Sequence, residues 1–181
     1  MPEVSEDAVL LIATSFQALN RIKDDESARI CNCAIVIVFA GFYVEANLTS
    51  IIDIIGKTGE MENWCFPDKK DPHPGLRDKL AWFYQNFVDK SNAIKKSIKD
   101  SDLNGKFPGF IDLWNFRNNL AHGKIDKNIK VETAKDLRIK AKKIVDELFD
   151  ICKQNGHDIE RITTYQDVIN SVNVGESDYS E

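Results

Sequence analysis

Three residues of one predicted helix have the types and spacing needed to act on a phosphodiester: Arg117, Asn118 and His122. Side chains four positions apart share a helical face, so Asn118 lies one turn from His122. Arg117 lies about 140° around the helix from His122, and both side chains can reach a phosphate that crosses the helix end. The guanidinium of an arginine can donate two hydrogen bonds to phosphate oxygens, and an imidazole can transfer protons near neutral pH. This set fits cleavage of RNA by its own 2′-hydroxyl, which requires neither a metal ion nor a protein nucleophile.

The same residues have a purely structural interpretation. Gly123 follows His122, and glycine commonly ends a helix in the left-handed conformation. The C-terminal end of a helix carries partial negative charge, which interacts favourably with a cationic imidazole. An arginine five residues before a histidine arises by chance in roughly one such chain in ten, so the spacing alone is weak. On spacing alone we favour the alternative that Arg117 pairs with an acid on a neighbouring helix.

Basic residues are concentrated in one part of an acidic chain. The whole chain has 24 lysines and arginines, 29 acidic residues and a net charge of −5, but residues 90–143 contain 14 basic and six acidic residues. Lys124, Lys127 and Lys130 follow the Arg/His segment, and Arg138 lies on the next predicted helix. We expect these four side chains to contact an RNA backbone. Charge alone favours the simpler alternative that they form solvated helix faces.

Other catalytic and metal-binding patterns are missing from the sequence. It contains no phosphate-cradling glycine loop, no H-E-x-x-H and no nucleophile elbow. We expect His73 and His157 to be inert, because nothing nearby would orient either one as an acid or base. The four cysteines lack metal-ligand spacing, which predicts reduced thiols and neither a metal nor a cofactor.

Helical periodicity predicts an all-α fold, an up-down bundle of four to five main helices. The expected helices span residues 5–22, 27–55, 76–88, 108–122 and 132–155. The run of about a dozen apolar residues at 33–44 is short of the roughly 18–20 that span a bilayer, so we interpret it as a buried core helix. A membrane span and a buried strand are the alternatives. Gly41 within this helix is expected to be a close-packing point.

The remaining segments divide the chain. Residues 1–157 are predicted to be the helical domain, and residues 158–181 a short C-terminal helix over 165–172 followed by an acidic tail. Three prolines in the connector 57–75 predict that it contains no regular helix. Residues 90–100 are expected to continue the preceding helix. Asn-Gly at 104–105 and Pro108 are expected to mark a turn. The N-terminus lacks a basic and apolar leader, which predicts a soluble, cytoplasmic protein.

The stretch LWNFRNNLAHGK resembles the signature of the HEPN superfamily, in which an arginine, a polar residue and a later histidine end a helix. Arg117, Asn118 and His122 match that signature residue for residue. The run AIVIVFAGFYVEANL is similar to the apolar helix that packs beside the motif helix, and Glu45 corresponds to its acid. The resemblance covers roughly residues 5–155, although the long connector has no counterpart.

The resemblance implies a helical bundle that pairs with a second copy, so that both motif helices face one cleft. Many members are metal-independent ribonucleases, including toxins of toxin–antitoxin and phage-defence systems. On this resemblance Arg117 stabilises the phosphorane charge, His122 transfers protons, Asn118 positions the phosphate or His122, and Glu45 orients the arginine. The expected partners are RNA, a second copy, and an antitoxin or other protein.

Two further interpretations stay open. The chain is either a non-catalytic HEPN-like module that binds nucleotides, RNA or protein, or an unrelated helical adaptor in which the motif is coincidental. Trp114 and Phe116 flank the motif and have the chemistry to stack on bases, but helical aromatic residues more often pack in the core.

Overall fold

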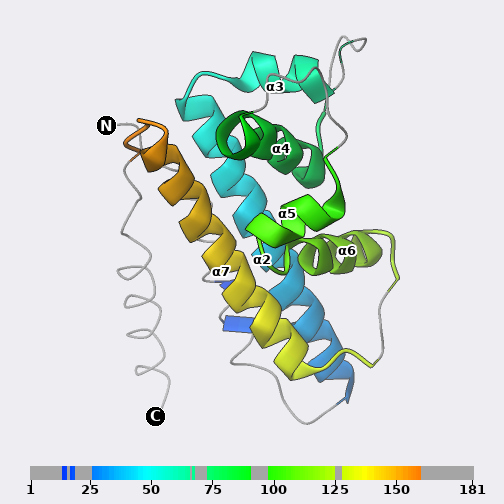
Figure 1. Ribbon diagram of the computed structural model, residues 1–181. Coiled ribbons are helices and arrows are strands. Elements are labelled where there is room, and N and C mark those ends of the chain that lie inside the picture. The colour runs from blue at the N-terminus through cyan, green and yellow to red at the C-terminus, as the bar shows by residue number, and fades with distance from the viewer. Residues whose placement is uncertain are drawn as a thin grey trace.

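The computed structural model describes residues 14, 15, 17, 18, 26–65, 67, 73–90, 98–124 and 128–159. In these ranges it contains helices and no strand, which confirms the predicted all-helical bundle (Figure 1). The elements are α2 (Glu26–Ile54), α3 (Thr58–Cys65), α4 (Leu76–Phe83), the π-helix η1 (Tyr84–Asp89), α5 (Asp100–Lys106), α6 (Phe110–Ala121) and α7 (Val131–Gln154). Most of the helix predicted over 5–22, and the predicted helix at 165–172 with its tail, lie outside the described residues.

The two longest helices, α2 and α7, lie side by side and run in the same direction (Figure 1). Near their N-terminal ends, Arg29 Nη1 donates a 2.7 Å hydrogen bond to the carbonyl of Ile129. The apolar stripe predicted for α7 is buried, because residues three and four apart face the bundle together. That stripe consists of Ala134, Leu137, Ala141, Ile144, Val145, Leu148 and Ile151. The predicted stop at Asn-Gly is also confirmed, with Gly156 at φ 82°.

Helix α2 is the central helix, and it packs against α4, α6 and α7. Its apolar stretch is longer than the run at 33–44. Within the described residues, Ala28–Ile54 has the length and mean hydropathy, 1.9, that would allow it to cross a membrane. More than half of its most apolar window, 56%, is buried inside the protein. The β-branched residues near its middle do not prevent helix formation, because burial outweighs differences in propensity of a few tenths of a kcal/mol.

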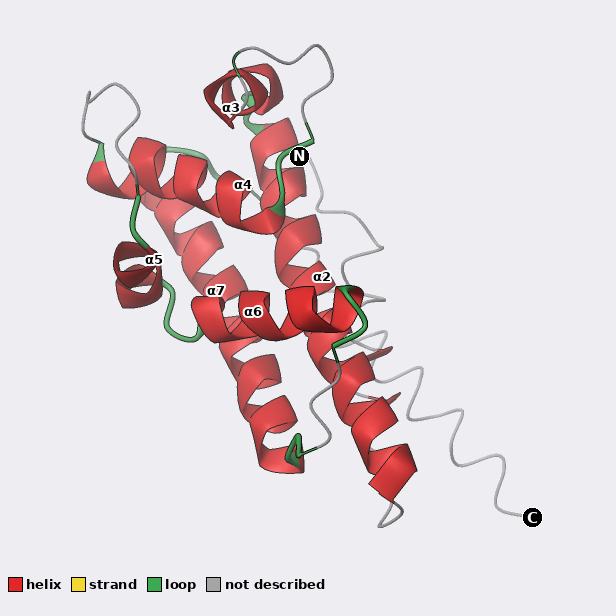
Figure 2. Ribbon diagram, turned by 90° about the vertical axis from the view of Figure 1, so that its right-hand side faces the viewer, coloured by secondary structure: helices red, strands yellow, loops and turns green. Residues whose placement is uncertain are grey.

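Helices α4 and α6 cross the same side of the α2–α7 pair, one above the other in Figure 2. Each is anchored by large buried side chains, Leu80 and Phe83 in α4 and Phe110 and Leu113 in α6. Burying such a side chain contributes roughly 1.5–3 kcal/mol. The two short helices are therefore held at fixed places along α2, and their side chains can meet over it.

The connector after α2 differs from the prediction, because its first half forms α3. The three prolines lie at or after position 67, beyond the end of α3, and so do not restrict it. The helix is stabilised by burial of Met61, which is 3% exposed, and by a hydrogen bond from Thr58 to the Asp53 carboxylate. The prediction that the connector contains no regular helix is therefore wrong for residues 58–65, and residues 66 and 68–72 lie outside the described residues.

The region between α4 and α6 also requires two corrections. The predicted continuation of helix through 90–100 is wrong at its start, because Lys90 adopts a left-handed conformation with φ 46° and ends the helix. Asn-Gly at 104–105 lies inside α5, so the turn is confined to residues 107–109. Leu103 and Phe107 are both fully buried, and their burial favours the extra helical turn despite the glycine.

Candidate functional site

Helix α6 carries the three motif residues, and glycines define both of its ends. Gly109 at its N-terminus has φ 84°, and a Cβ there would lie 2.2 Å from Cδ of Lys140. His122 is the C-cap, and Gly123 has φ 71° with its N–H bonded to Leu120 O at 3.0 Å. The predicted helix end at Gly123 is therefore confirmed, and His122 lies exposed at that end.

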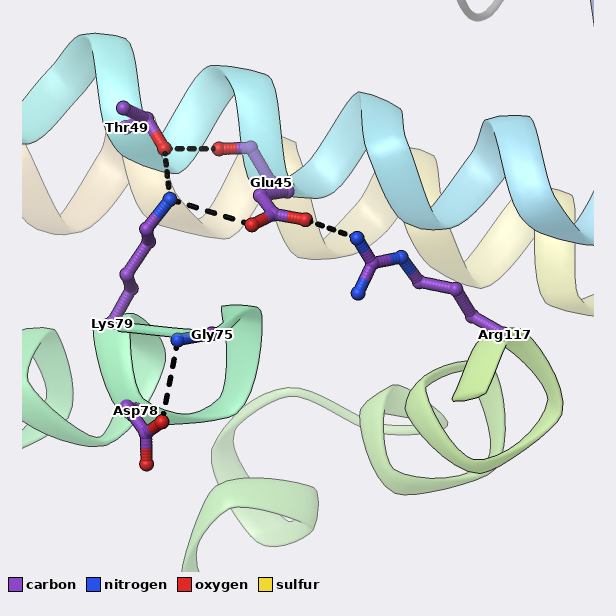
Figure 3. A network of polar contacts seen from close by, with 6 residues as sticks. All are labelled: Glu45, Thr49, Gly75, Asp78, Lys79 and Arg117. Carbon is purple, nitrogen blue, oxygen red and sulfur yellow. Dashed lines mark hydrogen bonds and ion pairs between the residues drawn. The ribbon is translucent and has the colours of Figure 1, made fainter. Parts of the chain in front are cut away.

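Arg117 points from α6 toward α2, where it forms an ion pair with Glu45 (Figure 3). Arg117 Nη2 donates to Glu45 Oε2 at 2.5 Å, and the side chains are only 20% and 21% exposed. Both sequence interpretations of Arg117 expect an acid beside it, and the structure identifies that acid as Glu45. A partly buried pair of this kind is held more firmly than an exposed one.

The stem of Arg117 crosses α2 at Gly41. A Cβ built on Gly41 would lie 2.9 Å from Arg117 Cδ and 3.4 Å from its Cγ, so an alanine would displace the arginine. The close-packing role predicted for Gly41 is confirmed. Arg117 Cζ also lies 4.8 Å from the ring centroid of Phe42, close enough for a cation–π contact. Phe42 is 39% exposed, so this aromatic ring lies at the surface beside the guanidinium.

A second cation, Lys79 of α4, binds the other oxygen of the same carboxylate. Lys79 Nζ lies 3.3 Å from Glu45 Oε1 and donates to Thr49 Oγ1 at 3.0 Å. Thr49 in turn donates its hydroxyl proton to the Glu45 carbonyl at 2.8 Å. The carboxylate thus lies between α4 and α6 and links both to α2 (Figure 3). Lys79 and Thr49 were not predicted as site residues, since neither belongs to a motif and Lys79 is 34 positions from Glu45.

His122 and Asn118 are placed differently from Arg117. His122 is exposed and Asn118 is half-buried. The backbone N–H of His122 bonds to the carbonyl of Asn118 at 3.0 Å, as in a regular helical turn. In the described part of the chain no side-chain hydrogen bond joins either residue to Arg117. One chain therefore assembles the Arg117–Glu45 pair but does not bring the imidazole onto it.

The predicted RNA-contacting residues differ in exposure. Lys124, which follows α6, and Lys130, which precedes α7, are exposed, while Lys127 lies outside the described residues. Arg138 is half-buried, with its Nε enclosed by protein atoms. The two lysines are thus available to a phosphate backbone, and Arg138 is less accessible. Trp114 and Phe116 are partly buried against the core, as expected for helical aromatic residues.

Two hollows among the described residues lie away from the motif residues, and neither is lined by them. A groove of about 460 Å³ lies between the α5–α6 turn and α7, and it is lined by Lys106, Phe107 and Ile139 among others. A smaller hollow of about 240 Å³ lies between α2, α3 and α4, with Lys79 and Thr49 in its wall. Arg117 and His122 face neither hollow.

The described residues contain no group of three or more histidine, cysteine or acidic side chains placed to hold a metal ion. All four cysteines are free thiols. Burial raises the pKa of Cys152 to about 12. Burial also raises the pKa of Cys33, where nearby Arg29 opposes the shift and Glu132 adds to it. These two thiols stay protonated and unreactive at neutral pH.

In comparisons with known proteins, no protein-family model, no curated protein and no solved structure matches this chain. The resemblance to the HEPN superfamily therefore stays a prediction from the sequence of α2 and α6.

Proposed function

We propose that this protein is a metal-independent endoribonuclease in which Arg117 and His122, supported by Asn118, act on one phosphodiester. The observation that carries the proposal is the way Glu45 holds Arg117. In the described part of the chain, Nη2 is the guanidinium nitrogen that has a protein partner, and Nε and Nη1 keep their protons for a ligand. An oriented guanidinium with free N–H groups suits two phosphate oxygens.

The proposed reaction is an in-line transesterification within the RNA. The 2′-oxygen attacks phosphorus, the P–O5′ bond breaks, and the products carry a 2′,3′-cyclic phosphate and a 5′-hydroxyl. A proton leaves the 2′-hydroxyl and another reaches the departing 5′-oxygen, and His122 supplies or accepts these protons. Arg117 stabilises the negative charge that grows on the phosphorane oxygens. Asn118, one turn before His122, positions the phosphate or the imidazole.

We propose that a second copy completes the site. Arg117 and His122 are not joined within one chain, and neither hollow encloses them. On α2, Ile35 and Phe42 are seven positions apart, share one helical face, and are 38% and 39% exposed. Phe42 contacts the Arg117 guanidinium, so this apolar face is continuous with the site. A two-fold contact over this face brings two copies of α6 near one another, and His122 of one copy then serves the phosphate held by the other.

Other features agree with an RNA substrate. Lys124 and Lys130 are exposed directly after the motif, where they extend the positive surface along the path of a bound strand. Such contacts produce affinity that depends on salt and tolerates sequence variation. A cytoplasmic toxin or phage-defence effector, neutralised by an antitoxin or another protein partner, is the setting we propose for an enzyme of this kind.

The choice of nucleophile provides a direct test. The protein is incubated with a single-stranded RNA and with the same sequence carrying 2′-O-methyl groups throughout. The proposal expects cleavage of the first strand, with cyclic phosphate at the new ends, and none of the second. Equal cleavage of both strands, or 3′-hydroxyl ends on the products, would show that another nucleophile acts and would overturn the mechanism.

A second candidate function is a non-catalytic module that binds nucleotides, RNA or protein. It is favoured by the exposed position of His122, which lacks a hydrogen-bonded orienting group among the described residues. The Glu45 ion pairs then serve only to clamp α4 and α6 onto α2. Binding of 2′-O-methyl RNA without turnover of ordinary RNA, at every protein concentration tried, would support this function over the first.

A further inference from the structure

We propose that Lys79 is a positioning residue for Arg117 and acts through Glu45; this inference rests on the proposed function. Three contacts carry it. Lys79 Nζ lies 3.3 Å from Glu45 Oε1, Lys79 also donates to Thr49 at 3.0 Å, and Glu45 Oε2 accepts from Arg117 at 2.5 Å. The two cations therefore occupy different oxygens of one carboxylate (Figure 3).

Because Lys79 occupies Oε1 of Glu45, it determines how Arg117 can bind the same carboxylate. Arginine–carboxylate pairs are frequently bidentate, with two parallel N–H···O bonds that use two guanidinium nitrogens. Here Lys79 holds Oε1, and Arg117 contacts Oε2 through Nη2. Lys79 thus keeps the pair monodentate and leaves Nε and Nη1 for phosphate oxygens. Without Lys79 the carboxylate is free to rotate and to accept a second hydrogen bond from Nε or Nη1, which would withdraw that nitrogen from RNA.

Lys79 also determines the charge of the cluster. Arg117 and Glu45 alone form a neutral pair, whereas the three side chains together carry one net positive charge. Lys79 is 15% exposed, the least of the three, so its field is screened less than that of a surface lysine. An anionic phosphorane beside Arg117 is therefore stabilised more strongly than it would be by the neutral pair.

The fold holds Lys79 in place through its neighbours on α4. Leu76 and Leu80 flank it in the same helix, and they are 1% and 0% exposed. The Thr49 hydroxyl fixes Nζ from the α2 side, and that hydroxyl is itself bonded to the Glu45 carbonyl at 2.8 Å. The alternative role for Lys79 is to tie α4 to α2 with no effect on Arg117, and the experiment separates the two.

The first experiment is a double-mutant cycle of RNA cleavage with Lys79→Met and Glu45→Gln. If Lys79 acts through Glu45, Lys79→Met lowers kcat by about tenfold to a hundredfold in the wild-type background, with a smaller change in KM. In the Glu45→Gln background the loss of kcat is smaller, because the residue that transmits the positioning effect is gone and only the field of the lysine charge remains. Lys79→Arg, which keeps the charge and the donors, restores most of the rate. Equal losses in both backgrounds would show an independent structural role and overturn the inference.

The matched control is Lys106→Met. Lys106 also joins two helices through an ion pair, 2.5 Å from Glu147, but it lies in α5 away from Arg117. This variant loses an interhelical ion pair of similar kind, and we expect its kcat to equal that of the wild type. If Lys79→Met does not fold, Lys79→Gln keeps a hydrogen-bond donor without the charge and is expected to show a smaller loss of kcat in the same cycle.

A second readout does not depend on catalysis. The guanidinium N–H groups of Arg117 are followed by NMR in the wild type, Lys79→Met and Lys106→Met. We expect faster rotation or a changed shift of the Arg117 Nη groups in Lys79→Met alone. If the wild type cleaves no RNA, the proposed function fails while this spectrum still tests the inference. Arg117 signals that are identical in all three proteins would contradict the positioning role, whether or not RNA is cleaved.

Discussion

Glu45 on α2 accepts a 2.5 Å hydrogen bond from Arg117 on α6, although the two residues are 72 positions apart in the chain. This contact makes the orientation of the arginine depend on how α6 crosses α2. Both residues lie on helices packed in the bundle, which hold a guanidinium more firmly than loops would. The proposed RNA cleavage depends on this arrangement.

Replacement of Glu45 tests whether the ion pair orients the arginine. Glu45→Gln removes the charge that two partly buried cations share, and we expect it to lower the free energy of unfolding by roughly 1–3 kcal/mol, between the values for exposed and buried pairs. RNA cleavage should fall at least tenfold. Urea unfolding and initial cleavage rates measure the two effects. Glu147→Gln, which breaks the more exposed pair with Lys106, is the control and should leave cleavage unchanged.

Gly41→Ala separates activity from stability. The added methyl group would come within 2.9 Å of Arg117 Cδ and push the side chain away from Glu45. Alanine in a helix interior gains up to about 1 kcal/mol over glycine, which offsets part of the lost ion pair. We therefore expect a change of less than about 1 kcal/mol in unfolding free energy, together with a clear loss of cleavage. Gly59→Ala in α3, where no atom lies within 4 Å, should keep full activity.

The buried thiol of Cys152 predicts a dependence of stability on alkaline pH. Its pKa is about 12 in the folded protein and near 9 when it is unburied. Between these values the unfolded chain binds fewer protons, so the free energy of unfolding falls as pH rises, by at most about 1.4 kcal/mol per pH unit from this group. Urea unfolding at pH 8 to 11 should show a shallower decline in Cys152→Ala than in the wild type. Identical slopes would contradict the burial effect.

The apolar face of α2 predicts how the subunits pair. Ile35→Lys places a charge on the face that we assign to the second copy, and we expect it to shift the protein from dimer to monomer and to reduce cleavage at low protein concentration. Ile139→Lys is a matched control, because Ile139 is 51% exposed on α7 and lines the groove beside α5. Sedimentation of both variants across a concentration series distinguishes them. A monomeric wild type would refute the dimeric site.

The long helices were predictable because their periodicity is strong. The apolar stripe of α7 requires burial of one helix face, and the continuous apolar pattern of α2 requires burial of nearly the whole helix. The short helices were less predictable. Helix α3 is stabilised by the burial of Met61 and by the Thr58–Asp53 hydrogen bond, and neither produces a periodic pattern in the sequence.

The π-helix η1 also lacks a sequence signal. Its carbonyl at Phe87 accepts a 3.2 Å hydrogen bond from Asn155, and the Phe87 ring stacks on Phe83 at 4.8 Å. The Asn155 contact joins segments that are 68 positions apart in the chain, so local helix propensity could not predict it. Helix 76–88 was therefore predicted at nearly the right length but with the wrong hydrogen-bond pattern near its end.

The candidate site was predictable only in part. Arg117, Asn118 and His122 form a local motif, and Glu45 followed from a resemblance. Lys79 and Phe42 become visible as neighbours of the site only when α4 and α2 are packed, since contacts between helices leave no fixed spacing in the sequence.

The most direct test of the central claim is cleavage of single-stranded RNA in excess EDTA by the wild type, Arg117→Ala and His122→Ala. His157→Ala is the control, because its ring packs against Phe87 and not at α6. We predict that the wild type and His157→Ala cleave RNA at the same rate, while the other two variants lose at least about a hundredfold and keep their circular dichroism spectra. Cleavage that survives both substitutions, or a folded wild type that never cleaves RNA, would contradict the account.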